Sequence, residues 1–497
     1  MDATEGAAAA GEPARHGLRE LIDERRAKAA RLRESDASAF PYSFPDVEPI
    51  EQLLSAYAHL QTGEETEDRH RVAGRILSLR DVGRMAFIDL VDRSGKIQLH
   101  ARADVLGEEA FKRLTGLDTG DLIGVDGAPL RSRRGELSLR VDSFQVLGKA
   151  LRPPPDKHHG LSDVETRLRR RELDLIASAE TRRVFIDRAR IISAVRAYLD
   201  ENGFVEVETP VLQPLYGGAL ARPFTTHHNA LDRDLYLRIA TELYLKRLLV
   251  GGLERVYELG KDFRNEGLST KHNPEFTMVE WYEAYADYEL ESRRLEALVA
   301  GAARAVGYAG ELEFERPWRR LSFFSAIAEA TRIDLSHARE GGALARAISE
   351  RGLEIRTADA SWEQMADDLL SKYVEPTLQQ PTFVLDYPVE LSPFAREHRS
   401  EPRLVERWEA FAGGMEIANA FSELTDPDVQ RERFEAQRQL TDAGEQEAQP
   451  YDELFVQALE QGMPPAGGVG LGIDRLVMLL TGSDSIREVV LFPAMRD

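Results

Sequence analysis

The sequence contains no cysteine among its 497 residues. This absence excludes disulfide bonds, thiolate metal sites and cysteine nucleophiles, so any metal must be held by carboxylate, imidazole or ligand oxygen atoms. Of the common metals, magnesium is the one that carboxylates favour. The chain also lacks an apolar run near the roughly 20 residues of a membrane helix, and its first residues have no apolar core of signal-peptide length. We therefore expect a cytoplasmic protein with no membrane partner.

The usual nucleotide-binding motifs are absent as well. Gly260-Lys261 is followed by Asp262, where a phosphate-binding P-loop requires Ser or Thr, and no Gly-x-Gly-x-x-Gly pattern opens a helix. An ATP site in this chain would therefore be of another kind.

The length and the charge set further limits. A chain of 497 residues is too long for one hydrophobic core and predicts two or three domains. The formal net charge of −22 argues against a nucleic-acid partner, but basic residues outnumber acidic ones in residues 131–172, and acidic residues dominate residues 426–460. Such runs are more often solvated faces than binding sites. The net charge alone therefore does not exclude a polyanion partner.

Residues 1–65 form a predicted N-terminal extension. Residues 1–15 are rich in alanine, glycine and acidic residues, a composition typical of disorder. Residues 16–35 place apolar residues at helical spacing with arginine and lysine between them, which predicts a basic amphipathic helix. This helix is either a solvated arm or a segment that contacts RNA.

Residues 66–150 carry the pattern of an OB-fold barrel, with short strands separated by turns. A short predicted helix, Glu108–Leu114, stands between the third and fourth strands, as in that fold. The open face of such a barrel commonly holds single-stranded nucleic acid. The five predicted strands are Val72–Leu79, Met85–Val91, Ile97–Ala101, Leu122–Gly127 and Leu137–Val146.

Four polar or aromatic side chains are predicted on that open face. Apolar neighbours set the core face of the second strand and turn Phe87 outward, and the same alternation turns Gln98 outward on the third. Arg80 and Glu136 lie nearby in the strand order. An aromatic ring beside an amide could stack on bases and read them. The alternative is a single surface aromatic on a small barrel.

A second domain is predicted over residues 181–497. A proline-rich and basic linker, residues 151–180, precedes it, and a helical pattern runs from there to Asn202. Residues 286–375 show mostly helical patterns and are predicted as an insertion into a sheet, which resumes at residues 382–387.

Residues 255–282 predict two strands joined by a loop at residues 265–274. Arg264 and Glu266 follow the first strand, and His272 closes the loop, so a cation, an anion and an imidazole converge. They suit phosphate, carboxylate and purine groups. Alternation in the second strand puts a carboxylate among aromatic and apolar side chains on one face, namely Phe276, Met278, Glu280 and Tyr282.

Residues 407–424 predict a hairpin with a two-residue turn at Gly413-Gly414. That register pairs Phe411 with Glu416 and Glu409 with Ala418, which puts both carboxylates on one face. Mg²⁺ bridging them to phosphate oxygens is the functional interpretation, and two unrelated solvent-facing acids is the alternative. Strict alternation sets three further residues opposite Glu416 unless a bulge lies between positions 416 and 419: Asn419, Phe421 and Glu423.

A third stretch, Gly468–Arg475, combines three glycines with an arginine at the start of a predicted helix. There the planar guanidinium of Arg475 can bind a triphosphate, and the dipole at the helix N-terminus favours the same anion. This pattern alone is a weak signal.

Together these stretches resemble the three signature motifs of the class II aminoacyl-tRNA synthetases, subclass b. Residues Gly203–Pro210 are similar to motif 1, Phe263–Glu266 with His272 and Phe276 to motif 2, and Gly468–Arg475 to motif 3. One departure is Asp474, because motif 3 generally has glutamate there. Four other stretches look like the bacterial-type, lysine-specific members: Thr226–Leu231, Arg238–Lys246, His272–Phe276 and Leu491–Met495.

The resemblance implies an α+β fold, with the OB-fold barrel followed by an antiparallel sheet flanked by helices and carrying a helical insertion. It implies ATP, L-lysine, Mg²⁺ and tRNA(Lys) as ligands, and a homodimer through the motif 1 region. Arg264 and Arg475 would be catalytic. The implied ATP-binding residues are Arg264, Glu266, His272, Asn273, Phe276 and Arg475; the lysine-binding residues are Glu242, Arg264, Glu280, Tyr282, Asn419, Phe421 and Glu423; the Mg²⁺ ligands are Glu409 and Glu416; and the anticodon-binding residues are Arg80, Phe87, Gln98 and Glu136.

The acidic residues implied around the amino acid favour a cationic substrate. Glu242, Glu280 and Glu423 suit an ammonium, and a buried carboxylate left unpaired by a neutral substrate would cost several kcal/mol. Ornithine is harder to reject, because one methylene is worth only about 1–3 kcal/mol. Relatives that lysylate a protein lack the barrel, and an inactive adaptor is expected to have lost Arg264, Arg475 or the two Mg²⁺ ligands, all of which are present.

Overall fold

The computed structural model describes residues 12–496, apart from 37, 38, 156–160, 316, 340, 359, 393 and 443–448. The predicted disordered start lies mostly outside these residues. The chain divides into two compact units, Met1–Arg167 with Glu172–Ser178, and Leu168–Arg171 with Ala179–Asp497. No helix of the described residues is long and apolar enough to cross a membrane.

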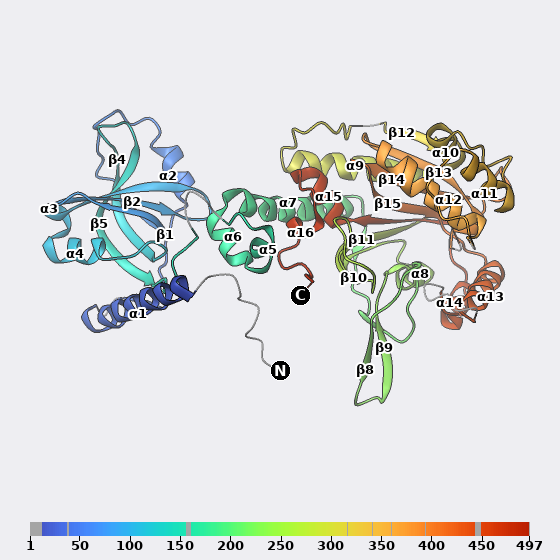
Figure 1. Ribbon diagram of the computed structural model, residues 1–497, viewed down its shortest axis with the longest axis horizontal. Helices are drawn as coiled ribbons and strands as arrows, with labels where there is room; N and C mark the ends of the chain where they lie inside the picture. The colour runs from blue at the N-terminus through green and yellow to red at the C-terminus, as the bar shows by residue number, and fades with distance from the viewer. Residues whose placement is uncertain are drawn as a thin grey trace. The chain divides into compact units, whose positions relative to one another are not determined.

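The first unit is built on a closed five-stranded barrel (Figure 1). Its strand order is β1-β2-β3-β5-β4, and β3 pairs with β5 in parallel while the other pairs are antiparallel. Every second residue of β2 and β3 is buried, as the predicted alternation requires. This confirms the OB-fold interpretation. The elements are β1 (His70–Asp81), β2 (Met85–Val91), β3 (Lys96–Arg102), α3 (Ala103–Leu106), α4 (Glu108–Thr115), β4 (Leu122–Arg131) and β5 (Leu137–Gly148).

The basic N-terminal helix α1 (Glu12–Ser35) packs on this barrel. The guanidinium of Arg25 is buried and donates to the carbonyl oxygens of Thr119 and Ala150, at 3.2 and 2.8 Å. Lys28 forms an ion pair of 2.7 Å with Asp118. Two of the basic side chains therefore attach the helix to its own domain. A second, short helix, α2 (Ile50–Ala56), adds Ile50 and Leu53 to the barrel core.

The second unit is organised around an eight-stranded sheet in the order β12-β13-β14-β15-β16-β11-β10-β6. The two outermost pairs, β12 with β13 and β10 with β6, are parallel, and the pairs between them are antiparallel. The strands are β6 (Val205–Glu206), β10 (Arg255–Phe263), β11 (Glu275–Ala284), β12 (Arg319–Ser322), β13 (Thr382–Pro388), β14 (Leu404–Ala412), β15 (Met415–Ser422) and β16 (Ala466–Gly472).

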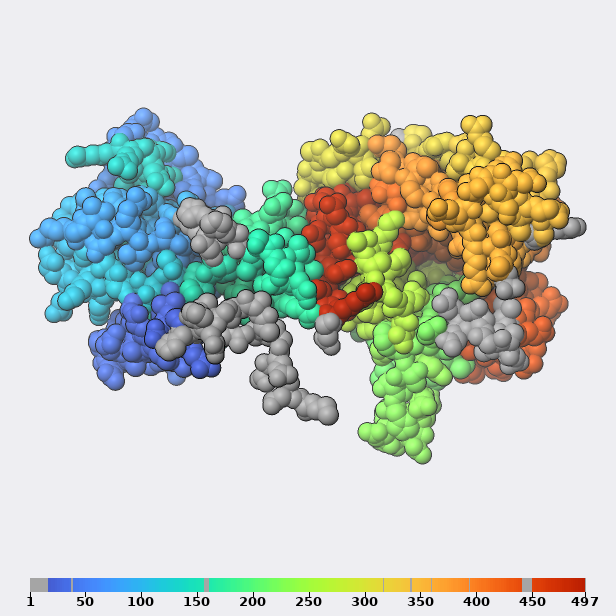
Figure 2. All heavy atoms as spheres, viewed as in Figure 1, coloured from blue at the N-terminus to red at the C-terminus, as the bar shows by residue number. Residues whose placement is uncertain are grey.

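A small three-stranded sheet precedes β10. Its hairpin projects from the second unit (Figure 2). It consists of β7 (Leu212–Gln213), β8 (Thr225–His228) and β9 (Arg233–Leu237). The helical pattern predicted before Asn202 is divided into α5 (Val164–Arg169), α6 (Arg171–Ala177) and α7 (Ala179–Glu201).

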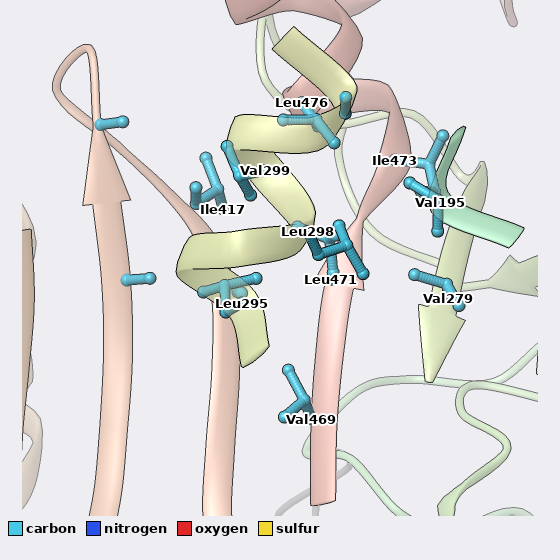
Figure 3. Packing of buried hydrophobic residues seen from close by; sticks show 14 of the residues in the cluster. Val195, Val279, Leu295, Leu298, Val299, Ile417, Val469, Leu471, Ile473 and Leu476 are labelled. Atoms are coloured by element: carbon cyan, nitrogen blue, oxygen red, sulfur yellow. The ribbon is translucent and has the colours of Figure 1, made fainter. Parts of the chain in front are cut away.

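Helices cover one face of the large sheet. Figure 3 shows side chains of α9 (Tyr288–Ala305) against Ile417 of β15 and Leu471 of β16, with α15 (Ile473–Thr481) beside them. Val279 and Trp281 of β11 are fully buried in this core. The intervening residues of β11 therefore point to the opposite face, where the polar residues gather. The sheet thus supplies a rigid floor for a site.

The predicted insertion begins too early. Residues 286–375 include α9, which packs in the main core, and β12, which is the outer strand of the sheet. The helical segment proper lies between β12 and β13 and has its own apolar cluster. The helical pattern of α9 indicates a helix but does not say which layer the helix joins. The inserted elements are α10 (Phe323–Thr331), α11 (Gly341–Glu350), α12 (Trp362–Leu369), a π-helical turn (Leu370–Val374) and a 3₁₀ turn (Glu375–Thr377).

Candidate active site

A cavity of about 390 Å³ opens on the face of the sheet away from α9, and the first turn of α15 lines part of it. Strands β11, β14, β15 and β16 form its floor, and the start of α8 (Glu242–Val250) borders it. It brings together every residue predicted for ATP, lysine or Mg²⁺ except Glu423. These lining residues are Glu242, Arg264, Glu266, His272, Asn273, Phe276, Glu280, Tyr282, Glu409, Glu416, Asn419, Phe421 and Arg475.

Arg264 lies where the predicted loop begins, and its guanidinium stacks over the ring of Phe276, 5.1 Å from the ring centroid. Its backbone N–H is bound to the carbonyl of Pro274, which fixes the chain at this point. The Nε atom is buried, yet no acceptor among the described residues bonds to it. A half-buried guanidinium with a buried, unused Nε donor is suited to an anionic ligand.

Arg475 lies in the first turn of α15, as predicted. It donates to the side chain and the backbone carbonyl of Glu416, at 3.0 and 2.7 Å, and lies 3.1 Å from Nε2 of His272. Burial and the charge of Arg475 hold the pKa of His272 below its ordinary value. The imidazole is therefore neutral near pH 7 and can accept a hydrogen bond from the guanidinium.

The departure from motif 3 at Asp474 has a structural explanation. Its carboxylate accepts a hydrogen bond from the backbone N–H of Thr277 at 2.7 Å and forms an ion pair of 2.5 Å with Arg188 of α7. It therefore joins α15 to β11 and α7 while Arg475 faces the cavity. An aspartate is long enough for these contacts.

Lys271, which the sequence prediction did not single out, holds the loop between β10 and β11. Its Nζ donates to Glu375 and to the carbonyl of Gly414, both at 2.8 Å. The loop is therefore attached to the inserted segment and to the β14–β15 turn.

The hairpin that carries the predicted Mg²⁺ ligands has the predicted turn. Both Gly413 and Gly414 have positive φ, 59° and 68°, as a two-residue hairpin turn favours. The pairing of Phe411 with Glu416 is confirmed, but Glu409 pairs with Asn419 and not with Ala418. Ile417 is the extra residue of a bulge, which lies between positions 416 and 419 as the shared pocket required. Its apolar side chain enters the core on the helical face.

Each of the two carboxylates on this hairpin has an arginine partner. Glu409 accepts from the hydroxyl of Tyr387 at 2.7 Å and pairs with Arg407 at 2.5 Å. Burial raises the pKa of Glu409 to about 7, although Arg407 opposes the shift. Among the described residues, no group of three or more His, Cys, Asp or Glu is placed to hold a metal ion. A cation between Glu409 and Glu416 would therefore also need oxygen atoms of a bound ligand to complete its coordination. A donor set made only of oxygen atoms suits Mg²⁺.

The opposite part of the cavity is acidic. Glu280 is 4% exposed, and its carboxylate accepts from the backbone N–H of Thr241 at 3.2 Å and from the hydroxyl of Tyr282 at 3.4 Å. No lysine or arginine of the described chain forms an ion pair with it. Burial, followed by the charges of Asp262 and Glu242, raises the pKa of Glu280 to about 8.

Glu423 is not among the residues that line the cavity, and its predicted contact with the amino acid stays a prediction. It is 1% exposed and forms an ion pair of 2.5 Å with Lys246 of α8, which also pairs with Glu242 at 2.6 Å. The sequence prediction missed Lys246. The available signal was the i, i+4 spacing of Glu242 and Lys246 in a largely apolar helix.

The four predicted anticodon residues come together on one face of the barrel. The guanidinium of Arg80 lies 5.8 Å from the ring centroid of Phe87, and Gln98 donates to Glu136 at 3.0 Å. A residue missed by the prediction, His100, stacks on Phe87 with centroids 5.1 Å apart and planes at 5°. Burial and the charge of Arg102 lower the pKa of His100, so it presents a neutral ring.

Comparisons with known proteins agree with both parts of the chain. The family described as "tRNA synthetases class II (D, K and N)" matches residues 163–496, and "OB-fold nucleic acid binding domain" matches residues 70–147. The chain is 50% identical over 490 residues to the lysine–tRNA ligase of Parasynechococcus marenigrum, which covers 96% of this chain and 98% of that protein. It is similar to the enzymes of the same name from Moorella thermoacetica, 52% identical over 456 residues (90% and 93%), and Dehalococcoides mccartyi, 48% over 479 residues (95% and 96%).

Proposed function

The chain belongs to the class II tRNA synthetases of the D, K and N group, and from this premise we propose how its cavity binds lysine and ATP and joins lysine to tRNA(Lys). The overall reaction is that of a lysine–tRNA ligase: L-lysine is activated with ATP to lysyl-adenylate and transferred to the 3′ end of the tRNA, with release of AMP and pyrophosphate. The residue roles that follow are our proposal.

The observation that carries the choice of lysine is the buried carboxylate of Glu280. Unpaired burial of a charge costs several kcal/mol, and the side-chain ammonium of lysine would supply the missing partner. Aspartate and asparagine carry no side-chain cation, so Glu280 would keep its proton and gain no ion pair with them. Tyr282 closes the same wall, and Asn419 and Phe421 border the cavity from β15. Together they form a site for an ammonium at the end of an apolar chain.

The activation step needs no nucleophile from the protein. The carboxylate of lysine attacks the α-phosphorus of ATP in line, and pyrophosphate leaves. Arg264 would receive the negative charge of both the carboxylate and the α-phosphate, and Arg475 would receive that of the γ-phosphate. Catalysis then consists of positioning and charge neutralisation by donors already in place. Glu266, His272, Asn273 and Phe276 would hold the rest of ATP.

Glu409 and Glu416 would hold Mg²⁺, which supplies shielding of the phosphate charge when bound. The fit rests on the pair of carboxylates on one face of the bulged hairpin, beside Arg475. In Glu416→Gln, the Mg²⁺ concentration that gives half-maximal activity should rise. An unchanged value would show that Glu416 does not bind Mg²⁺.

The experiment that tests the proposed function is lysine-dependent exchange of pyrophosphate into ATP, repeated with aspartate, asparagine and ornithine. Exchange should occur with lysine, fail with aspartate and asparagine, and be reduced with ornithine by an amount set by about 1–3 kcal/mol for one methylene. Absence of exchange with lysine would refute the proposal.

Binding of lysine should depend on pH through Glu280. Below its raised pKa of about 8 the free carboxyl holds a proton, which it must lose to pair with an ammonium, so binding releases a proton. The Michaelis constant for lysine should therefore fall as pH rises toward 8, by up to about tenfold per unit for one proton, and then level off. Glu280→Gln should flatten this profile. A slope that persists in the variant would assign the proton to another group.

We propose that Arg80, Phe87, Gln98 and Glu136 contact the anticodon. Phe87→Ala should lower kcat/KM for tRNA by about ten- to a hundredfold, because stacking on one base is worth about 1–3 kcal/mol. Pyrophosphate exchange without tRNA should stay unchanged, since the cavity lies in the other unit. Val105→Ala, which truncates an exposed side chain on α3, is the matched control. Equal loss in both reactions would argue against an anticodon role.

We further infer a cytoplasmic homodimer that associates through the motif 1 region, Gly203–Pro210. Apolar side chains in and after this region are exposed in the single chain, and a second copy would cover them. Sedimentation of the full chain as a monomer at micromolar concentration would refute the dimer. The exposed side chains are Val205, Val211, Leu212, Leu215 and Leu220.

A further inference from the structure

The last part of the described chain lies against the loop that joins β10 and β11. Residues 486–496, here called the C-terminal strap, follow α15 along the chain. The backbone N–H of Ile486 donates to the carbonyl of Thr270 at 2.8 Å, and the N–H of Ala494 donates to Oδ1 of Asn273 at 3.2 Å. The strap therefore holds this loop at two points, next to residues proposed to bind ATP.

The side-chain amide of Asn273 is already engaged within the protein. Its Nδ2 atom donates to the carbonyl of Glu275 at 2.6 Å, and its Oδ1 atom accepts from the strap. The residue is 8% exposed, so little of it faces solvent. Through this side chain Asn273 therefore sets the position of its loop, which also carries His272.

A buried arginine holds the strap from another side. Arg171, the first residue of α6, is 1% exposed. Its guanidinium donates to three backbone carbonyls of the strap, those of Arg487 (2.8 Å), Val490 (3.3 Å) and Leu491 (3.0 Å). The last carbonyls of a helix have no partner within it, and one guanidinium can satisfy several of them at the end of α16 (Ile486–Val489). Arg171 therefore helps to fix the path of the strap.

Apolar burial already attaches the strap to the second unit. Ile486 and Val489 are 2% and 0% exposed and pack in the main core. Arginine is almost never fully buried unless it is paired, so Arg171 adds a defined path to a segment that is anchored without it. Its place in the chain is also particular, because residues 168–171 belong to the second unit and residues 172–178 to the first.

The loop has other attachments that do not involve the strap. The backbone N–H of Arg264 bonds to the carbonyl of Pro274 at 2.9 Å, and Lys271 is bound to the inserted segment. Loss of the strap contacts would therefore free the part of the loop that carries His272 and Asn273, while Arg264 would stay in place. The effect should fall on ATP more than on lysine.

We propose that Arg171 is a positioning residue for ATP, which acts through the C-terminal strap on Asn273 and so sets the conformation of the loop at residues 265–274. This inference rests on the proposed function, because it assumes that the loop binds ATP, and it adds a residue outside the cavity. Binding of ATP then depends on a side chain at the point where the chain passes from one unit to the other. Binding of lysine does not, because its proposed pocket is bordered by β11, β15 and α8, which are not part of this loop.

The first test is Arg171→Met, which keeps an unbranched side chain and removes the donors to the strap. We expect the Michaelis constant for ATP in pyrophosphate exchange to rise by at least about fivefold, while that for lysine stays within about twofold. Arg171→Lys keeps the charge but not the planar fork, so it should restore only part of the affinity for ATP. Arg293→Met, which removes an exposed arginine from α9, should change neither constant.

The second test shows whether Arg171 acts through Asn273. Asn273→Ala removes the acceptor for the strap and should itself raise the Michaelis constant for ATP. In Arg171→Met/Asn273→Ala the constant should stay within about twofold of that of Asn273→Ala, because the contact through which Arg171 acts is already lost. Two independent defects would instead multiply.

A third variant, Ala494→Pro, acts at the other end of the strap. Proline has no N–H to donate to Asn273, so the contact between strap and loop is lost while Arg171 remains. The Michaelis constant for ATP should again rise by at least about fivefold, and that for lysine should stay within about twofold. If Arg171→Met does not fold, this variant decides by the same criteria.

Three results would overturn the inference. They are a rise in the ATP constant of Arg171→Met below about fivefold, an equal rise in the constant for lysine, and a double variant in which the two effects multiply. A failure of the unmodified chain to catalyse exchange with lysine would instead refute the proposed function. The two failures are therefore distinguishable.

Discussion

Replacing Arg264 by alanine is expected to lower the rate of lysine-dependent pyrophosphate exchange by about 10²–10³-fold or more, the loss measured for one donor to a developing charge in other enzymes. The guanidinium lies over Phe276 with a buried Nε that no described residue engages. It thus has a fixed position and unused donors at the point where the proposed carboxylate and α-phosphate meet. The loss should appear mainly in kcat, since charge accumulates there in the transition state.

Two variants make this result interpretable. Arg264→Lys keeps the charge but not the planar fork, so it should restore only part of the rate. Arg304→Ala removes an arginine from an exposed ion pair with Glu315 on the covered side of the sheet and should leave the exchange unchanged. Exchange by Arg264→Ala within about tenfold of the original would contradict the proposed role.

The sequence predicted the regular parts of the fold because they depend on local periodicity. The strands of the barrel lie within a few residues of their predicted bounds, and the two strands joined by the loop at residues 265–274 are confirmed. Alternation in β11 correctly separated the core face, with Val279 and Trp281, from the cavity face. The two-residue strands β6 and β7 are too short to produce such a pattern.

The parts that could not be predicted depend on contacts between distant segments. The bulge at Ile417 changes the partner of Glu409. This bulge lets Ile417 pack in the core while its neighbours in the strand line the cavity, a requirement that local periodicity does not contain. Lys246 was overlooked because a lysine in a helix is usually solvated; its burial follows from Glu423, far along the chain. The layer in which α9 packs likewise depends on the whole sheet and cannot be read from the local sequence of the helix. The residue roles in the cavity remain predictions.

Gly468→Ala should strongly weaken lysine binding, because the added methyl group has no room. An added Cβ would collide with the carboxylate of Glu423 and the ring of Tyr282. The φ of Gly468 lies outside the left-handed region, so lack of room is the cause. Overpacking of this kind costs about 1–3 kcal/mol in stability. Displacing a carboxylate from a buried ion pair costs about 3–5 kcal/mol, so the Michaelis constant for lysine should rise by about a hundredfold or more.

The measurement is pyrophosphate exchange over a range of lysine concentrations, together with thermal unfolding. Gly301→Ala is the matched control, because a Cβ at this position of α9 would meet only the end of Arg304 at 4.0 Å. It should preserve both constants and, as alanine favours a helix over glycine, slightly raise stability. The expected signature of Gly468→Ala is a folded protein that retains affinity for ATP and loses affinity for lysine. An unchanged lysine constant would mean that Glu423 and Tyr282 can move without consequence, and the wall they form with Lys246 would then not determine the substrate.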